Sequence, residues 1–341
     1  MGTIWTAYPC CALPGPEWRA HPPGPRVARG KEDGVPVNIP RDLPARTTLE
    51  AENVFVMIDE RATHQDIRPL RIAIVNLMPT KIATETHLLR LLGNTPLQLE
   101  ITLLHMGSHE PRNTPAGHLD AFYATFDEVR EETFDGLVIT GAPVELLPFE
   151  EVDYWDELVG LLEWSRTHVY STMHVCWGAQ AALYHHYGVP KRELPAKLFG
   201  VFDHEVLAPR HRLLSGFDEA FRAPHSRYTE TPAAAVAAVP GIEVLVTSPE
   251  AGLYLAASTD GRQVFVTGHP EYDPETLHME FVRDRERGMA TQPPLHYYVD
   301  DDPTREPHVT WRSHAYLLYA NWLNYCVYQG TPYDRTNIGR D

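Results

Sequence analysis

The chain contains 341 residues, of which 43% are hydrophobic, 22% are charged and four are cysteines. This balance is typical of a soluble globular protein with one large or two modest domains. The formal net charge of -17 argues against a nucleic-acid partner, because phosphate binding needs clustered lysine and arginine. The apolar runs are all shorter than the roughly 18 residues of a membrane span, so we expect no membrane partner either.

Residues 1–35 differ in composition from the rest of the chain. They are crowded with proline, glycine and arginine and lack the continuous apolar stretch of a secretory signal. This composition predicts a disordered N-terminal extension, followed by a single α/β domain over residues 36–341. The cysteines show neither paired spacing nor zinc-ligand spacing, so we expect a reducing, cytoplasmic location.

From residue 68 onward, the hydrophobic pattern alternates between strands and helices. Near-continuous apolar runs predict buried strands at 70–78 and 97–106, from 134 into a Gly-Ala-Pro loop, and at 169–175. Residues 85–94 and 154–168 have the periodicity of helices. Helices that connect such strands form βαβ units, so the pattern predicts a doubly wound, mostly parallel sheet with helices on both faces.

The second half of the chain changes character. Three strand-like runs follow at 242–248, 253–259 and 263–268, and the Asp-Gly pair between the last two is a hairpin signal. These strands are therefore expected to be antiparallel. Aromatic and aliphatic residues then recur at helical spacing over 313–329, which predicts a helical C-terminal elaboration with Cys326 as core filler.

Cys176 lies where the hydrophobic pattern changes from that of a strand to that of a helix. Residues 169–175 are rich in apolar residues, whereas the residues after Cys176 are good helix formers up to Gly188. In open α/β sheets, ligands bind at such turns, where the N–H groups of the new helix favour a thiolate. A single cysteine is commonly core filler, but this turn and the following Gly178 equally suit a nucleophile.

A nucleophilic thiol needs a base, and the base needs a group that fixes its tautomer. The stretch GHPEYD, residues 268–273, offers both. Side chains two residues apart in an extended segment leave the same face, so Glu271 can reach the imidazole of His269. Taken alone, these residues also fit a solvent-exposed loop. Together with the upstream cysteine, they favour a catalytic site of Cys176, His269 and Glu271.

The adjacent pair His185 and His186 raises the question of a metal. Neighbouring histidines on a helix point in different directions, and the sequence offers no carboxylate at a suitable spacing. We therefore expect no metal site.

Several longer motifs occur in a fixed order along the chain. They are NLMPTK (76–81), RNTPAGHL (112–119), FDGLVITGAP (134–143), VCWGAQAAL (175–183), APHSRY (223–228), VTGHPEYD (266–273), WRSH (311–314) and NWLNY (321–325). Together they resemble the homoserine O-acyltransferase family of methionine biosynthesis, whose fold is similar to that of class I glutamine amidotransferases. The resemblance runs from about residue 36 to about residue 334, and so many motifs in order make it specific.

The resemblance implies a ping-pong acyl transfer. Cys176 attacks the thioester of an acyl-CoA co-substrate, and the hydroxyl of L-homoserine then takes the acyl group. His269 accepts the thiol proton and later deprotonates the hydroxyl, while Glu271 orients it. The oxyanion needs preorganised donors, for which the backbone amide of Trp177 and one amide from the 76–81 loop are candidates. No bound cofactor is implied, and the family resemblance suggests a homodimer.

The family's contacts to homoserine fall on Lys197, Ser226 and Arg283. Arg283 suits a carboxylate because its guanidinium donates two parallel hydrogen bonds, although its charged neighbours also fit an exposed helix. Lys197 and Ser226 carry no local signal and rest on the resemblance alone.

Glu145 is the position at which the resemblance indicates the acyl donor. Family members that use succinyl-CoA have glycine there, whereas glutamate is associated with acetyl-CoA. A carboxylate in the acyl pocket would fill space and repel the free carboxylate of a succinyl group. We therefore expect acetyl-CoA as the donor and succinyl-CoA as the alternative, unless Glu145 points into solvent.

The strongest rival is a glutamine-hydrolysing amidotransferase, which shares the fold, the thiolate and the His-Glu pair. Such enzymes usually have a glycine two residues before the nucleophile, where this chain has His174. A cysteine hydrolase and a non-catalytic binding module of the same fold are the remaining alternatives. The presence of all three catalytic residue types disfavours the binding module.

Overall fold

The computed structural model of the protein describes residues 37–40, 42–51, 56–57, 68–109, 114–332, 335 and 338. The extension predicted for residues 1–35, and the domain boundary after it, lie outside these residues. Within the described ranges, no helix is long and apolar enough to cross a membrane.

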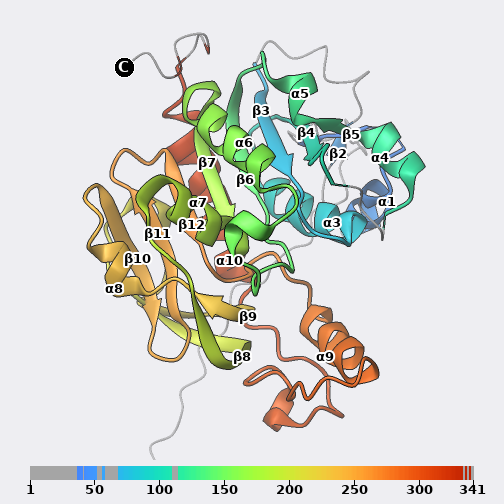
Figure 1. Ribbon diagram of the computed structural model, residues 1–341, viewed down its shortest axis with the longest axis vertical. Helices are drawn as coiled ribbons and strands as arrows, with labels where there is room; N and C mark the ends of the chain where they lie inside the picture. The colour runs from blue at the N-terminus through green and yellow to red at the C-terminus, as the bar shows by residue number, and fades with distance from the viewer. Residues whose placement is uncertain are drawn as a thin grey trace, which may run out of the picture. The chain divides into compact units, whose positions relative to one another are not determined.

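A twelve-stranded sheet forms the centre of the described structure (Figure 1). Its strands are β1 (Val37–Asn38), β2 (Val56–Met57), β3 (Leu70–Val75), β4 (Leu99–His105), β5 (Tyr123–Thr125), β6 (Phe134–Ile139), β7 (Val169–Val175), β8 (Arg192–Val206), β9 (Ala220–Glu230), β10 (Ile242–Ser248), β11 (Gly252–Ser258) and β12 (Gln263–Val266). Their order across the sheet is β2-β1-β4-β3-β6-β7-β12-β11-β10-β8-β9, and β5 pairs with β4.

The two halves of the sheet differ in strand direction. Neighbouring strands run parallel from β2 to β12 and antiparallel from β12 to β9. Both the mostly parallel sheet and the antiparallel hairpins predicted from the sequence are thereby confirmed. Strands β3, β6 and β7 are buried almost throughout, which explains their near-continuous apolar runs.

The sequence did not predict the long antiparallel pair of β8 and β9. Polar residues and prolines interrupt both strands, and buried and exposed positions do not alternate regularly along β8. The pairing register also shifts between Glu193 and Leu198. Neither strand therefore shows the clean period of two that identifies a half-buried strand in a sequence. This pair matters for the site, because it carries Lys197 and Ser226.

Helices connect and flank the strands. The α-helices are α1 (Ala45–Ala51), α3 (Lys81–Leu92), α4 (Ala116–Phe122), α5 (Phe126–Val129), α6 (Trp155–His168), α7 (Trp177–Tyr187), α8 (Ala233–Ala237), α9 (Thr276–Glu286) and α10 (Arg312–Asn321). Three short 3₁₀ turns are η1 (Phe149–Glu151), η2 (Arg212–Leu214) and η3 (Val299–Asp301), and a π-helix is η4 (Trp322–Tyr328).

These helices cover both faces of the sheet. Helices α1, α3 and α10 share one apolar cluster with the sheet, and α5, α6, α7 and α8 share another. Figure 1 shows α6 in front of the central strands and the red C-terminal helix behind them. The predicted doubly wound arrangement is confirmed.

The predicted C-terminal helix is present and packs directly on the sheet. It begins at Arg312 and passes from α10 into the π-helix η4. A Cβ added to Gly136 would lie 3.0 Å from the ring of Trp322, so this ring occupies the space over β6. Cys326 is a free, buried thiol, and burial raises its pKa to about 11, which agrees with its predicted role as core filler.

A segment that the sequence did not predict lies between β12 and α10. It contains α9 and has its own small apolar cluster, which includes Leu277, Tyr297 and Trp311. It is joined to β8 by a parallel bridge between Gly200 and Leu295. The helix α9 therefore stands beside the β8–β9 end of the sheet (Figure 1).

Replacing Gly200 with alanine is expected to destabilise this junction strongly. Gly200 has φ 152°, and an added Cβ would lie 2.3 Å from the backbone oxygen of Leu295, which cannot move without breaking the bridge. Strain and overpacking together should lower the free energy of unfolding by about 2 to 5 kcal/mol. Gly188 is the matched control, because it has φ 66° but open space around its Cα. Its alanine variant should lose only about 1 kcal/mol in urea unfolding, and equal losses would contradict the steric argument.

Candidate active site

The chain turns sharply at Cys176, between β7 and α7. The residue has φ 50° and ψ -114°, a backbone conformation that costs about 1 to 3 kcal/mol in a residue with a Cβ. Its N–H donates to the carbonyl oxygen of Val266 at 2.7 Å, which fixes the turn to the neighbouring strand β12. The predicted strand-to-helix turn is therefore present. Strain of this kind is typical of functional residues.

Two glycines allow the close packing around this turn. A Cβ added to Gly178 would lie 2.7 Å from the carbonyl oxygen of Thr140, and one added to Gly141 would lie 3.2 Å from Cβ of Cys176. Glycine at both positions lets the start of α7 approach the end of β6. Cys176 consequently lies against the backbone of the loop that follows β6.

His269 and Glu271 lie beside Cys176, as the sequence predicts. Nδ1 of His269 is 2.7 Å from Oε1 of Glu271, and the imidazole lies close enough to Cys176 for the two groups to interact electrostatically. Desolvation lowers the pKa of His269, but the negative charges of Cys176 and Glu271 outweigh it and raise this pKa well above its usual range. The geometry thus favours a protonated imidazole beside the sulfur of Cys176.

Two further contacts hold the His269 segment in place. The ring of Tyr272 stacks on the imidazole with a centroid distance of 4.2 Å and an interplanar angle of 17°. Asp273 forms ion pairs with Arg90 at 2.5 Å and with His87 at 3.1 Å, both on α3. The imidazole therefore has a fixed orientation, which a general base requires.

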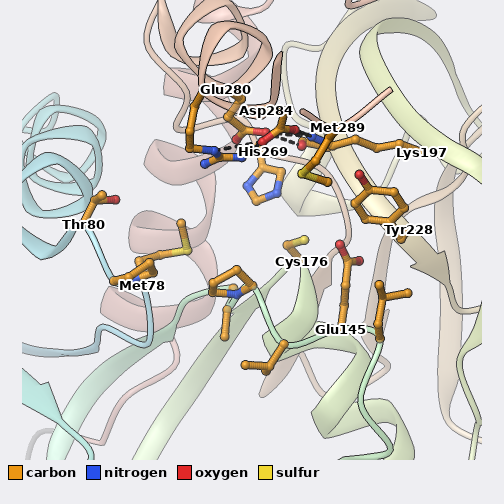
Figure 2. Close-up of a pocket in the computed structure, with 18 of the residues that line it drawn as sticks. Met78, Thr80, Glu145, Cys176, Lys197, Tyr228, His269, Glu280, Asp284 and Met289 are labelled. Carbon is orange, nitrogen blue, oxygen red and sulfur yellow. Dashed lines mark hydrogen bonds and ion pairs between the residues drawn. The ribbon is translucent and has the colours of Figure 1, made fainter. Parts of the chain in front are cut away.

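Cys176 and His269 line a cavity of about 600 Å³ (Figure 2). Its walls come from α9, from the β8–β9 pair, and from the loops after β3 and β6. This volume falls within the range of small-molecule sites. The predicted nucleophile and base are therefore accessible to a ligand.

Lys197, Ser226 and Arg283 come from three different elements and converge in this cavity. Lys197 Nζ donates to Asp284 at 2.9 Å, and Arg283 Nη2 donates to the same carboxylate at 2.7 Å. Ser226 Oγ donates to Glu280 at 2.6 Å. This end of the cavity thus offers fixed cations and fixed carboxylates side by side, which suits a zwitterionic ligand.

Sequence reasoning missed Glu280 and Asp284. They lie four residues apart on α9, so they share one helical face with Arg283 between them. That spacing was the available signal, but it is common on exposed helices. The residues that donate hydrogen bonds to these two carboxylates lie on β8 and β9, which are distant in the sequence.

Glu145 points into the cavity rather than into solvent. Its carboxylate accepts hydrogen bonds from the backbone N–H and the hydroxyl of Thr229, at 3.3 and 3.2 Å. Figure 2 shows the carboxylate directed toward Cys176. Burial raises the pKa of Glu145, while the hydrogen bonds and the charge of Arg227 oppose that rise. A carboxylate therefore borders the space next to the nucleophile.

Arg227 is a second residue without a sequence signal. It is only 2% exposed, and it donates to the carbonyl oxygens of Thr267 and Ala251 at 3.1 and 2.5 Å. Desolvation lowers its pKa, and the nearby charges of Cys176 and Glu145 oppose this effect. The Arg227 guanidinium is thus a buried cation near Cys176. Its hydrogen bond to Thr267 holds the segment between β12 and His269 in place.

The structure places the predicted oxyanion-hole donors in different surroundings. The N–H of Trp177 belongs to the first residue of α7, where helix geometry provides no acceptor. In the 76–81 loop, the N–H groups of Leu77 and Met78 already donate to Thr140 and Asn76, at 2.8 and 3.1 Å. The backbone of Gly141 also lies close to Cys176.

The argument against a metal at His185 and His186 used a wrong premise. A carboxylate does reach them, because Glu163 on the adjacent helix α6 lies 2.7 Å from Nε2 of His185 and 3.8 Å from Nδ1 of His186. In the part of the chain that the structure describes, these three residues are the one group whose ligand atoms lie close enough to hold a metal ion. The group lies on the opposite end of α7 from Cys176.

The chain matches known proteins over most of its length. A family model described as homoserine O-succinyltransferase matches residues 36–333. A homoserine O-acetyltransferase of Acetivibrio thermocellus is 58% identical over 304 residues, which cover 89% of this chain and 100% of that protein. Those of Brevibacillus brevis and Desulfovibrio desulfuricans are 57% and 56% identical, over 90% of this chain and 100% and 98% of their own lengths.

Solved structures agree on the fold. A glutamine amidotransferase from Thermotoga maritima aligns with a TM-score of 0.50 over 77% of this chain and 100% of its own. Its sequence is only 12% identical, so the likeness concerns architecture alone. The resemblance to a class I glutamine amidotransferase fold is confirmed.

Proposed function

Because the chain belongs to the homoserine O-succinyltransferase family, we propose that it transfers an acetyl group from acetyl-CoA to the hydroxyl of L-homoserine through a thioester on Cys176. The observation that carries this proposal is that Cys176 and His269 line a ligand-sized cavity while Glu271 lies 2.7 Å from the imidazole of His269. The homodimer and the cytoplasmic location expected from the resemblance are part of the proposal and rest on that resemblance alone.

In the first half-reaction, the Cys176 thiolate attacks the thioester carbon of acetyl-CoA. The bond to the coenzyme A sulfur breaks, and the imidazolium of His269 protonates the departing thiolate. The oxyanion of the tetrahedral intermediate is assigned to the N–H of Trp177 and a backbone N–H near Gly141, which lies close to Cys176. Acetyl-Cys176, a neutral His269 and free coenzyme A remain.

In the second half-reaction, neutral His269 removes the proton from the homoserine hydroxyl, whose oxygen attacks the acetyl carbon. Cys176 leaves as a thiolate, and the imidazolium is restored. The polar end of the cavity supports binding of the amino acid. Arg283 and Lys197 suit its carboxylate, and Glu280 suits its ammonium group.

The choice between the two acyl donors depends on Glu145. The family model is described as a succinyltransferase, whereas the relatives named above are acetyltransferases. A succinyl group on Cys176 would bring its free carboxylate toward the Glu145 carboxylate in a desolvated space, which is strongly unfavourable. This geometry supports acetyl-CoA as the donor.

The proposal is tested by the intact mass of the protein after exposure to each donor without homoserine. Wild-type protein is expected to gain one acetyl group from acetyl-CoA, to lose it when homoserine is added, and to react at least about 100-fold more slowly with succinyl-CoA. Glu145→Gly should remove most of this discrimination. Because burial raises the pKa of Glu145, wild-type discrimination should also weaken as the pH falls toward that raised pKa and the carboxylate becomes protonated.

Glu151→Gly, an exposed acidic residue of the following turn, is the matched control and should keep the wild-type preference. Preferential succinylation of the wild-type protein would overturn the assignment of the donor. The absence of an adduct from either donor would overturn acyl transfer itself.

A further inference from the structure

The cavity wall combines polar and apolar side chains. Lys197, Ser226 and the carboxylates of α9 form its polar end. Exposed apolar side chains also line it: Leu146 and Leu147, which are 56% and 42% exposed, on the loop after β6, and Met289, which is 42% exposed and bonded through its backbone N–H to Asp284. Exposed apolar side chains gathered at a cavity mouth are typical of a ligand-binding surface.

One face of α9 runs from the polar end to this mouth. Glu280, Arg283 and Arg287 follow one another at helical spacing and all line the cavity. Exposure increases along this face, because the side chain of Glu280 is largely buried, that of Arg283 is about half exposed and Arg287 is exposed. The mouth is therefore at the C-terminal end of α9.

The cationic side chains of the cavity wall differ in whether they are already paired with a carboxylate. Lys197 and Arg283 are both paired with Asp284. Arg287, in contrast, makes no side-chain hydrogen bond or ion pair to any described residue. It is thus the cation of the cavity wall whose charge is available to a ligand.

This distribution restricts how a polyanion can approach. The protein has a formal net charge of -17, and the polar end of its cavity holds the carboxylates of Glu280 and Asp284. Lys197 and Arg283 balance these carboxylates and are already paired with Asp284, so phosphate groups need a further local cation. A thioester must nevertheless reach Cys176, so the remainder of the donor has to leave the cavity through the apolar mouth.

We propose that this mouth is the coenzyme A subsite, in which Leu146, Leu147 and Met289 contact the pantetheine arm and Arg287 binds the phosphate groups. The inference rests on the proposed acyl transfer and adds the residues that recognise the part of the donor that is not transferred. The phosphates lie outside the reacting centre, so Arg287 contributes to donor affinity and not to chemistry.

The test compares acetyl-CoA with S-acetylpantetheine, a thioester that lacks every phosphate, in steady-state transfer to homoserine. Arg287→Ala is expected to raise KM for acetyl-CoA about tenfold, leave kcat within about twofold, and change KM for S-acetylpantetheine less than about twofold. Leu146→Ser should raise KM for both donors, about threefold each, because both carry the pantetheine arm.

Arg285→Ala is the matched control, since Arg285 is an exposed arginine of the same helix that does not line the cavity. It should leave KM for both donors unchanged. An Arg287→Ala variant with unchanged KM for acetyl-CoA, or with equal increases for the two donors, would overturn the subsite. Failure of the wild-type protein to use either thioester would instead overturn the proposed function, and the subsite with it.

Discussion

Replacing Cys176 with alanine is expected to reduce acetyl transfer from acetyl-CoA to homoserine by at least about 1,000-fold. The thiolate forms the covalent bond on which both half-reactions depend, and alanine leaves the rest of the cavity intact. The buried imidazolium of His269 also loses the negative charge that helps to raise its pKa. The measurement is the rate of O-acetylhomoserine formation by chromatography, together with the intact mass after exposure to acetyl-CoA.

Cys326→Ala is the control for this experiment. Its thiol belongs to a buried residue of η4, and burial raises its pKa to about 11, so it has almost no thiolate at neutral pH. Activity within about twofold of wild type is expected. Turnover by Cys176→Ala near the wild-type rate would rule out the acyl-enzyme and favour direct transfer between the two substrates.

Glu271→Gln is expected to lower kcat by about 100- to 10,000-fold while the protein stays folded. The carboxylate holds Nδ1 of His269 at 2.7 Å and contributes to the raised pKa of the imidazole. A glutamine keeps the shape but supplies no charge, so the pKa of His269 should fall and the imidazolium should pair less well with the thiolate. Steady-state kinetics over a range of pH will measure this loss.

A second readout separates this electrostatic role from a merely structural one. Alkylation of Cys176 by iodoacetamide requires the thiolate, which the imidazolium of His269 stabilises. In Glu271→Gln, the alkylation profile should therefore move to higher pH than in wild type. Glu286→Gln, an exposed residue of α9, should leave the profile unchanged. An unchanged profile in Glu271→Gln would contradict the role given to the carboxylate.

The parts of the site that residue patterns alone predicted are those with a local signal, whereas the cavity-lining Glu145, Lys197, Ser226 and Arg283 were expected mainly from the family resemblance. Cys176 marks the change from strand to helix, and His269 and Glu271 are two residues apart in an extended segment. Both patterns involve only a few neighbouring residues, so they can be recognised without knowledge of the fold. The buried strands β3, β6 and β7 were predictable for the same reason, because their apolar runs are continuous.

The parts that were missed depend on contacts between distant segments. Arg227 lies in an irregular strand, and its function follows only from Thr267 and Cys176, which approach it in space. Glu163 likewise reaches His185 across two helices, so an argument from spacing along the chain could not find it. Sequence spacing is informative within one element and uninformative between packed elements.

The placement of α9 has a consequence for how substrate preference can change. The nucleophile and its base lie directly at the ends of β7 and β12, whereas Glu280, Arg283 and Arg287 lie on or just after α9, further along the chain. Substitutions in that segment can alter recognition without disturbing the strained turn at Cys176. Chemistry and acceptor recognition can therefore diverge independently in this architecture, and new amino-acid acceptors are best sought by varying α9.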